Sequence, residues 1–218
     1  MYIGKNSNGD LVEAKRASKE DEYICPCCEQ PLILRQGTIK VPHFAHKSGH
    51  ECDAWYGEMS EWHRQWQEMF PIENREVVIN CNGERHRADV CFGKYVVEFQ
   101  NSPMSYKEFD KRTKFYTDAG YKLIWVFNLE DKEILLHHIN GTYRWMRWSK
   151  TFKNFFAKNG KSLLYFQFRN IHTKCTELHR IDWLSNCKDG YSAKYFRVFY
   201  KGPFRPEQFV NYMKYGFM

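Results

Sequence analysis

The chain has 218 residues, which suffices for one sizeable core with a small attached unit and excludes a large multidomain assembly. Hydrophobic residues make up 43% of the chain and aromatic residues 17%, which argues against a disordered protein. The 33 Lys and Arg residues outnumber the 26 Asp and Glu residues, giving a net charge of +7, and this balance favours a polyanionic partner such as nucleic acid.

Residues 1–53 predict short β-strands. An alternating strand-like run covers residues 11–14, and two further runs, 32–35 and 38–41, flank a Gln-Gly pair that fits a hairpin turn. A unit of this size has too little apolar area to fold alone. We therefore expect a covalent or metal staple, for which the cysteines of this segment are candidates.

Residues 54–130 predict the central part of the fold. Large apolar residues recur every three to four positions before Pro71, which indicates an amphipathic helix. Gly120 stands where the residue after a helix end often adopts the left-handed conformation. The predicted order is a helix over 54–70, strands over 75–80, 85–92 and 94–100, a helix from Ser105 to Gly120, and a buried strand over 122–127.

The sequence of residues 131–218 predicts an α+β appendage. We expect a strand over 133–139, a short helix over 149–157, three strands between 162 and 201, and a closing helix over 206–215. The sequence thus predicts a β-rich unit over 1–53, a core over 54–130 and an appendage over 131–218. The fold class is α/β with a mixed α+β sheet.

Gly93 opens a two-residue connection between two predicted strands. Such a connection fits a type II′ turn, which has glycine first, and a hairpin of this kind fixes the register of its strands. Stepping back from the turn sets Asp89 opposite Glu98, and Arg87 opposite Gln100. Because side chains alternate along a strand, these residues share one face.

Two carboxylates opposed in this way suggest a divalent metal site. Directly opposed residues have Cβ atoms roughly 4.5–5.5 Å apart, so two negative charges would repel each other. A Mg²⁺ ion between Asp89 and Glu98 removes this conflict and can accept phosphate oxygens of a substrate. The alternative is that Arg87 merely neutralises the two carboxylates in a surface cluster.

A cluster of cysteine and histidine residues predicts a structural zinc site in the first 53 residues. The segment contains a C-x2-C knuckle followed by HFAH and a further cysteine, and four thiolate or imidazole ligands close a tetrahedral zinc site. His43 is our alternative candidate for one of the four ligands. We expect that Cys27 does not bind the metal. The predicted zinc ligands are Cys25, Cys28, His46 and Cys52.

A second group of such residues lies near the C-terminus. Its members fall in strand-like sequence and have no standard spacing for a metal site. We therefore interpret them as ordinary residues. They are His172, Cys175, His179 and Cys187.

Three motifs carry a resemblance to a known family. SEWHRQWQ, HRADV and VVEFQNSPMS occur in this order, followed by a helix and a strand ending LIWVF, with CPCC and HFAH upstream. This arrangement resembles the CoiA-like competence nucleases of the PD-(D/E)XK superfamily. The resemblance implies a restriction-endonuclease-like core, with Asp89 as the first acidic metal ligand and Glu98 as the second.

The resemblance also assigns roles to neighbouring residues. Gln100 stands where the superfamily usually has a lysine, which would orient the attacking water and balance negative charge. An amide can orient water, but it cannot balance charge. Arg87, or Lys107 and Arg112 on the following helix, would supply the missing positive charge and contact DNA.

The helix before the strands carries an acidic residue and a histidine that match the family pattern. Glu61 would be a third metal ligand or would hold a metal-bound water. His63 would contact phosphate or transfer a proton. Both residues are also consistent with a solvent-exposed helix face.

These observations predict a nuclease that hydrolyses phosphodiester bonds of single- or double-stranded DNA with Mg²⁺ or Mn²⁺, together with a structural Zn²⁺. DNA is preferred to RNA by the resemblance alone, and recombination, DNA processing and defence are all open as roles. The alternatives are a catalytically weak or inactive nucleic-acid-binding module and a zinc-stapled protein-interaction domain. No apolar run of 18 residues and no secretory leader is visible, so we expect a cytoplasmic protein.

Overall fold

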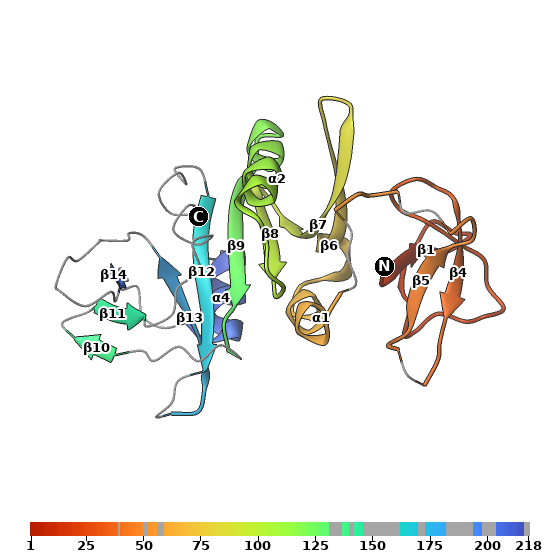
Figure 1. Ribbon diagram of the computed structural model, residues 1–218. Helices are drawn as coiled ribbons and strands as arrows, with labels where there is room; N and C mark the ends of the chain where they lie inside the picture. The colour runs from red at the N-terminus through yellow and green to blue at the C-terminus, as the bar shows by residue number, and fades with distance from the viewer. Residues whose placement is uncertain are drawn as a thin grey trace. The chain divides into compact units, whose positions relative to one another are not determined.

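The computed structural model divides the chain into two compact units, residues 1–91 and 92–218, which are described separately (Figure 1). The predicted boundaries near residues 53 and 130 remain sequence-based predictions. The structure describes residues 1–38, 40–49, 52–55, 59–130, 137–139, 142–145, 162–169, 173–181, 194–197 and 204–215.

The first unit begins with an antiparallel sheet in the order β2-β1-β3-β4-β5. The strand predicted at 11–14 is confirmed as β2. The strand predicted at 38–41 is wrong, because the partner of β4 begins only after Pro42, which has no backbone N–H to donate to a ladder. The strands are β1 (Ile3–Lys5), β2 (Leu11–Glu13), β3 (Tyr23–Ile24), β4 (Pro31–Arg35) and β5 (His43–His46).

A small apolar core fills this sheet. Phe44 on β5 is 1% exposed and lies 4.8 Å from the ring of Tyr23, measured between ring centroids. The backbone N–H of Phe44 donates to the carbonyl oxygen of Met1 at 2.8 Å, which ties the segment before β1 to β5. The buried members of the core are Met1, Ala14, Ala17, Tyr23, Cys25, Cys27, Leu32 and Phe44.

The rest of the first unit is a helix and a hairpin. α1 (Glu61–Glu68) begins later than the predicted residue 54, because Ser60 caps it and the preceding Trp55 N–H is held by Asp53 Oδ1 at 2.9 Å in a turn. A 3-10 turn, η1 (Ile72–Asn74), leads to the antiparallel strands β6 (Arg75–Cys81) and β7 (Glu84–Phe92). Both predicted strands are confirmed.

In the second unit, four of the described strands lie side by side in the order β13-β12-β9-β8. β8, β9 and β12 run parallel to one another, and β13 is antiparallel to β12. The main elements are β8 (Tyr95–Gln100), α2 (Tyr106–Asp118), β9 (Lys122–Asn128), β12 (Ser162–Arg169), β13 (Thr176–Ile181) and α4 (Pro206–Tyr215). A separate sheet is formed by β10 (His137–Ile139), β11 (Thr142–Trp145) and β14 (Lys194–Arg197).

Helices α2 and α4 cover opposite faces of these four strands. Trp125 on β9 pairs in register with Leu164 on β12, so their side chains share a face, and the Trp125 ring lies 5.2 Å from Phe109 of α2. Tyr165 follows Leu164 and therefore points to the other face, where its ring lies 5.0 Å from Phe209 of α4. The result is a helix–sheet–helix arrangement, which confirms the predicted mixed α/β class.

The ends of α2 lie where the sequence placed them. The Ser105 side chain accepts a hydrogen bond from the Glu108 N–H at 3.1 Å, and Gly120 has the left-handed φ of +86° that follows many helix ends. The helix predicted at 206–215 is confirmed as α4. The helix predicted at 149–157 lies outside the described residues. No helix in the described part of the chain is both long and apolar enough to cross a membrane.

Candidate active site and metal centre

Four side chains converge at one end of the N-terminal sheet. Cys25 and Cys28 lie on the turn after β3, His46 ends β5, and Cys52 lies on the segment that follows. Their ligand atoms all lie within 4.8 Å of one another. Cys25 Sγ is 3.6 Å from Cys52 Sγ, and Cys28 Sγ is 3.2 Å from His46 Nε2. The four residues selected from the sequence are therefore brought together.

The chemistry of this Cys3His set fits zinc. Thiolate and imidazole are the donors that structural zinc sites use, and four of them complete a tetrahedron. Burial raises the pKa of the Cys25 thiol, although the Arg87 guanidinium acts in the opposite direction. Burial, followed by the neighbouring Cys25, also raises the pKa of Cys52. A bound cation would favour the deprotonated thiols that this environment otherwise disfavours, so the cluster could bind zinc.

The other Cys and His residues that we considered as metal ligands lie outside this group of four. His43 Nδ1 is 2.9 Å from the Val41 carbonyl oxygen, and Cys27 packs in the apolar core beside the cluster. In the second unit, His179 Nε2 is 3.1 Å from Glu177 Oε2, and Cys175 is exposed. His172 and Cys187, which we considered with them, lie outside the described residues.

Glu98 is a buried carboxylate on β8. Its side chain is on the face that α2 covers, because Glu98 pairs in register with Trp125. It is 4% exposed, and its Oε1 accepts a hydrogen bond from the Tyr116 hydroxyl at 2.8 Å. The Arg112 Nη1 lies 3.5 Å from Glu98 Oε2. The carboxylate is thus held from two sides by one helix.

Arg112 joins Glu98 to a second acid. Burial acts to lower the pKa of Arg112, but the negative charges of Glu98 and Glu108 outweigh it and raise that pKa. The guanidinium therefore stays charged, and its Nη2 also donates to Glu108 Oε1 at 2.5 Å. Tyr116 was not selected from the sequence. Its position four residues after Arg112, on the same helix face, is the signal that could have found it.

Asp89 on β7 contacts helix α1 within the first unit. Gln67 Nε2 lies 3.4 Å from Asp89 Oδ1, and the Gln67 side chain is only 3% exposed. A buried amide beside a carboxylate orients that carboxylate. Gln67 was also missed from the sequence, although it follows His63 by four residues and therefore shares its helix face.

The two α1 residues selected from the sequence have different surroundings. The Glu61 side chain is 50% exposed and forms an ion pair with Arg64. Hydrogen bonding by Arg64 lowers the pKa of Glu61, so this carboxylate stays charged. His63 is partly buried, and its Nδ1 lies 2.8 Å from the Ser60 hydroxyl.

The structure also describes three other polar residues that we selected from the sequence, Gln100, Lys107 and Arg87. Gln100 Nε2 donates to the Ser102 carbonyl oxygen at 2.6 Å and lies 3.1 Å from its hydroxyl. Lys107 lies exposed on α2. Arg87 is 9% exposed, and its backbone N–H donates to Asp53 Oδ2 at 2.7 Å, so this predicted DNA contact is a largely buried side chain.

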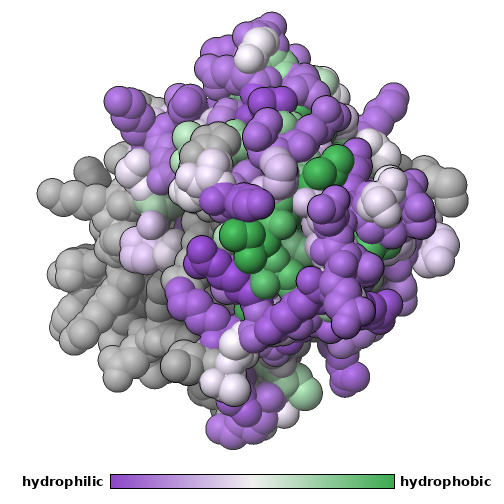
Figure 2. All heavy atoms as spheres, turned by 90° about the vertical axis from the view of Figure 1, so that its right-hand side faces the viewer, coloured by the Kyte–Doolittle hydropathy of each residue, from purple (hydrophilic) through white to green (hydrophobic). Residues whose placement is uncertain are grey.

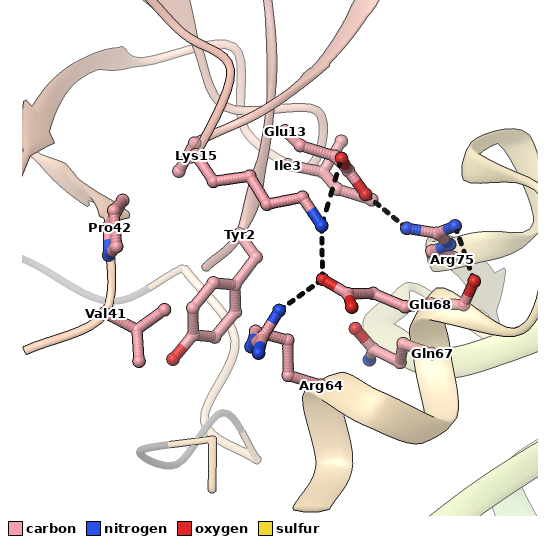
Figure 3. Close-up of a pocket in the computed structure, with 11 residues that line it drawn as sticks. Tyr2, Ile3, Glu13, Lys15, Val41, Pro42, Arg64, Gln67, Glu68 and Arg75 are labelled. Atoms are coloured by element: carbon pink, nitrogen blue, oxygen red, sulfur yellow. Dashed lines mark hydrogen bonds and ion pairs between the residues drawn. The ribbon is translucent and has the colours of Figure 1, made fainter. Parts of the chain in front are cut away.

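A pocket lies beside α1 in the first unit (Figure 3). Its basic groups are joined to acids rather than left unpaired, since Glu68 forms ion pairs with both Lys15 and Arg64. Its lining residues are Tyr2, Ile3, Glu13, Ala14, Lys15, Val41, Pro42, Arg64, Gln67, Glu68 and Arg75. Gln67 therefore contacts Asp89 and also lines this pocket.

Apolar side chains also reach the surface of the N-terminal unit. Figure 2 shows hydrophobic atoms surrounded by a hydrophilic surface on the face that it presents. The large apolar residues with more than a third of their surface exposed include Ile24, Ile33 and Val41.

Comparison with known proteins identifies two adjoining regions. Residues 6–54 match the family model described as competence protein CoiA, N-terminal domain, and residues 61–197 match that described as competence protein CoiA, nuclease-like domain. The chain is 45% identical over 49 residues to Druantia protein DruB of Escherichia coli (strain UMEA 4076-1). That match covers 22% of this chain and 9% of DruB. No solved structure matches the chain.

We expect protein purified without chelator to carry about one zinc per chain, because four donors form one site. Elemental analysis of three proteins tests this assignment. The parent and Cys27→Ser should retain the metal, whereas Cys28→Ser should lose most of it. Stripping the metal should unfold residues 1–53, because zinc binding supplies folding free energy. Equal zinc content in both variants, or a parent without zinc, would contradict the assignment.

Proposed function

Because the chain belongs to the competence protein CoiA family and carries its nuclease-like domain, we propose that it hydrolyses phosphodiester bonds of DNA with a divalent metal ion. The observation that carries the proposal is the buried Glu98, an acid held in place by Tyr116 and Arg112 inside that domain. A buried carboxylate is costly, and its retention in a nuclease-like domain suits a metal ligand.

The proposed second ligand is Asp89, as in PD-(D/E)XK nucleases. β7 ends at Phe92 and β8 begins at Tyr95, and Gly93 between them has φ +56°, as the first residue of a primed turn requires. This supports the predicted hairpin register, in which Asp89 opposes Glu98. The Gln67 contact gives Asp89 a fixed orientation of its own.

The metal ion would be Mg²⁺ or Mn²⁺, since hard cations prefer carboxylate oxygens, and when bound it would activate water and stabilise charge on the phosphate. The residues of the chain prepare the site for it. Tyr116 and Arg112 orient the Glu98 carboxylate, and Gln67 orients Asp89. Because the Gln100 Nε2 already donates to Ser102, its Oε1 is the atom that would accept a hydrogen bond from the attacking water.

Arg112 is the best-supported source of the positive charge that the usual lysine would supply. Its guanidinium lies 3.5 Å from Glu98, and its pKa is raised by the acids beside it. Arg87 is less suited, because its side chain is largely buried and acts on the thiol of Cys25. Lys107 is exposed and remains our candidate for contact with the DNA backbone.

The α1 residues have supporting roles in this proposal. His63 would contact a phosphate or transfer a proton, and its orientation is set by Ser60. Glu61 would have to leave its ion pair with Arg64 to bind metal directly, so a role through an intervening water fits its surroundings better.

The zinc site would be structural in this function. Its four protein ligands leave no position for substrate, which is the arrangement of a structural rather than a catalytic zinc. A second candidate function, a nucleic-acid-binding module without turnover, is favoured by Gln100 in place of the lysine. The carboxylate variants below separate the two functions.

We expect Asp89→Asn and Glu98→Gln each to abolish cutting while leaving DNA binding largely intact, because each removes one proposed metal ligand without changing side-chain size. The assay uses labelled single- and double-stranded DNA with Mg²⁺, Mn²⁺ or chelator. Asp110→Asn, on the exposed side of α2, is the control and should cut like the parent. Cutting at the parental rate by either site variant would overturn the ligand assignment. An inactive parent under all metals would favour the binding module.

Tyr116→Phe removes only the hydroxyl that donates to Glu98. We expect activity or metal affinity to fall about 10–100-fold, the usual effect of losing a group that orients a metal ligand. Tyr106→Phe is the matched control, because its hydroxyl bonds to the exposed Asp110 on the same helix. Equal Mg²⁺ dependence in both variants would show that the Tyr116 hydroxyl does not act on the site.

If the Gln100 amide orients the attacking water, Gln100→Ala should slow cutting by roughly 10²–10³-fold, as when one preorganised polar group is removed from an active site. Gln100→Lys tests the mechanism further. Retained activity would show that the site still works with the superfamily's usual residue, whereas loss together with weaker metal binding would show that another cation already supplies the charge. A Gln100→Ala protein as fast as the parent would rule out a role for this side chain.

A further inference from the structure

Asp53 is a buried carboxylate directly after the candidate zinc ligand Cys52. It is 2% exposed, and donors surround it. Oδ2 accepts from the Arg87 backbone N–H at 2.7 Å, while Oδ1 lies 2.8 Å from His86 Nδ1 and accepts from the Trp55 N–H at 2.9 Å. The mechanism proposed above gives this acid no role.

The surroundings of Asp53 fix its carboxylate rather than leave it mobile. The Trp55 ring stacks on the His86 ring, with centroids 3.2 Å apart and an interplanar angle of 7°. On the far side of the same imidazole, Nε2 lies 3.3 Å from Glu84 Oε2. Hydrogen bonds to a buried charged group are among the stronger ones, and removing the acceptor leaves its donors unsatisfied.

Two of the residues that Asp53 contacts, His86 and Arg87, belong to β7. Arg87 precedes Asp89 by two residues, so the two side chains share a face of that strand. The Arg87 guanidinium also acts electrostatically on Cys25, another member of the zinc cluster. The segment that contains Cys52 and Asp53 therefore contacts β7 through the Arg87 backbone amide and the His86 side chain.

We propose that Asp53 is a positioning residue that couples the zinc site to the strand carrying Asp89, so that loss of zinc releases β7 and lowers cutting. The effect on cutting rests on the proposed function, whereas the coupling itself does not. Zinc fixes Cys52, and Cys52 fixes the adjacent Asp53. Asp53 then fixes the backbone of β7 at Arg87.

Asp53→Asn tests the coupling, because an asparagine has a single acceptor oxygen. Its side chain cannot accept hydrogen bonds from the Arg87 N–H on one side and from both His86 Nδ1 and the Trp55 N–H on the other. Glu84→Gln is the matched control, since Glu84 contacts the same imidazole without reaching the Arg87 amide. The readouts are zinc content, hydrogen exchange of the β7 amides, and kcat and KM for DNA over a range of Mg²⁺ concentrations.

We expect Asp53→Asn to keep its zinc and its KM for DNA, to exchange the Arg87 amide at least ten times faster, and to lose about 10–100-fold in kcat. Part of that loss should return at high Mg²⁺, because a displaced Asp89 weakens the proposed metal site. A purely structural defect would lower the amount of folded protein without changing the Mg²⁺ dependence. Glu84→Gln should behave like the parent in every readout.

Zinc removal provides the second measurement and needs no variant. Chelation of the parent should speed exchange at Arg87 and slow cutting, whereas in Asp53→Asn it should add little to either effect, because coupled changes are not additive. Slow exchange at Arg87 in zinc-free parent protein would overturn the coupling, even if Asp53→Asn fails to fold. Fast exchange in a protein that cuts no DNA under any metal would instead sustain the coupling and refute the proposed nuclease function.

Discussion

Buried carboxylates constrain this structure more than any other feature, because a charge removed from water must be met by hydrogen-bond donors. Glu98, Asp53 and Glu76 are 4%, 2% and 5% exposed. Each finds its donors far along the chain: Glu98 in the Tyr116 hydroxyl, Asp53 in the Arg87 amide, and Glu76 in backbone amides of β1 and the residue before it. These contacts tie β8 to α2, the cysteine-rich segment to β7, and β1 to β6. The same acids therefore determine which secondary structures meet and which side chains are oriented for chemistry.

Glu76 shows that the chain accepts backbone strain for one of these contacts. It lies within β6 but has φ +49°, a left-handed conformation that costs a non-glycine residue on the order of 1–3 kcal/mol. Both of its carboxylate oxygens then accept hydrogen bonds from the backbone at the start of the N-terminal sheet, at 3.1–3.2 Å. Hydrogen bonds to a charged group contribute about 1.5–3 kcal/mol each, so the contact offsets the strain that makes it possible.

The features that were predicted correctly from the sequence are those set by neighbouring residues in the chain. The helix from Ser105 to Gly120 follows from a cap at each end, and the Cys3His cluster, which could bind zinc, follows from ligand types at familiar spacing. Expectations were wrong where distant contacts decide the outcome, as at the start of α1. There Asp53 accepts a hydrogen bond from the distant Arg87 amide and also holds the Trp55 N–H in a turn. Gln67 and Tyr116 were missed for the same reason. A glutamine or tyrosine on a helix gains its role only from the carboxylate that the fold brings to it.

In the site that we propose, Arg112 supplies positive charge, and we infer that a lysine at position 100 is not needed. Asp89 and Glu98 would bring two negative charges to the metal, and Arg112 brings one positive charge from α2 to within 3.5 Å of Glu98. Because Arg112 also pairs with Glu108, the group keeps a net negative charge, which attracts a divalent cation. A lysine on β8 would reduce this negative charge, which is the effect that Gln100→Lys tests. With Arg112 present, we infer that a neutral amide at Gln100 orients water without weakening metal binding.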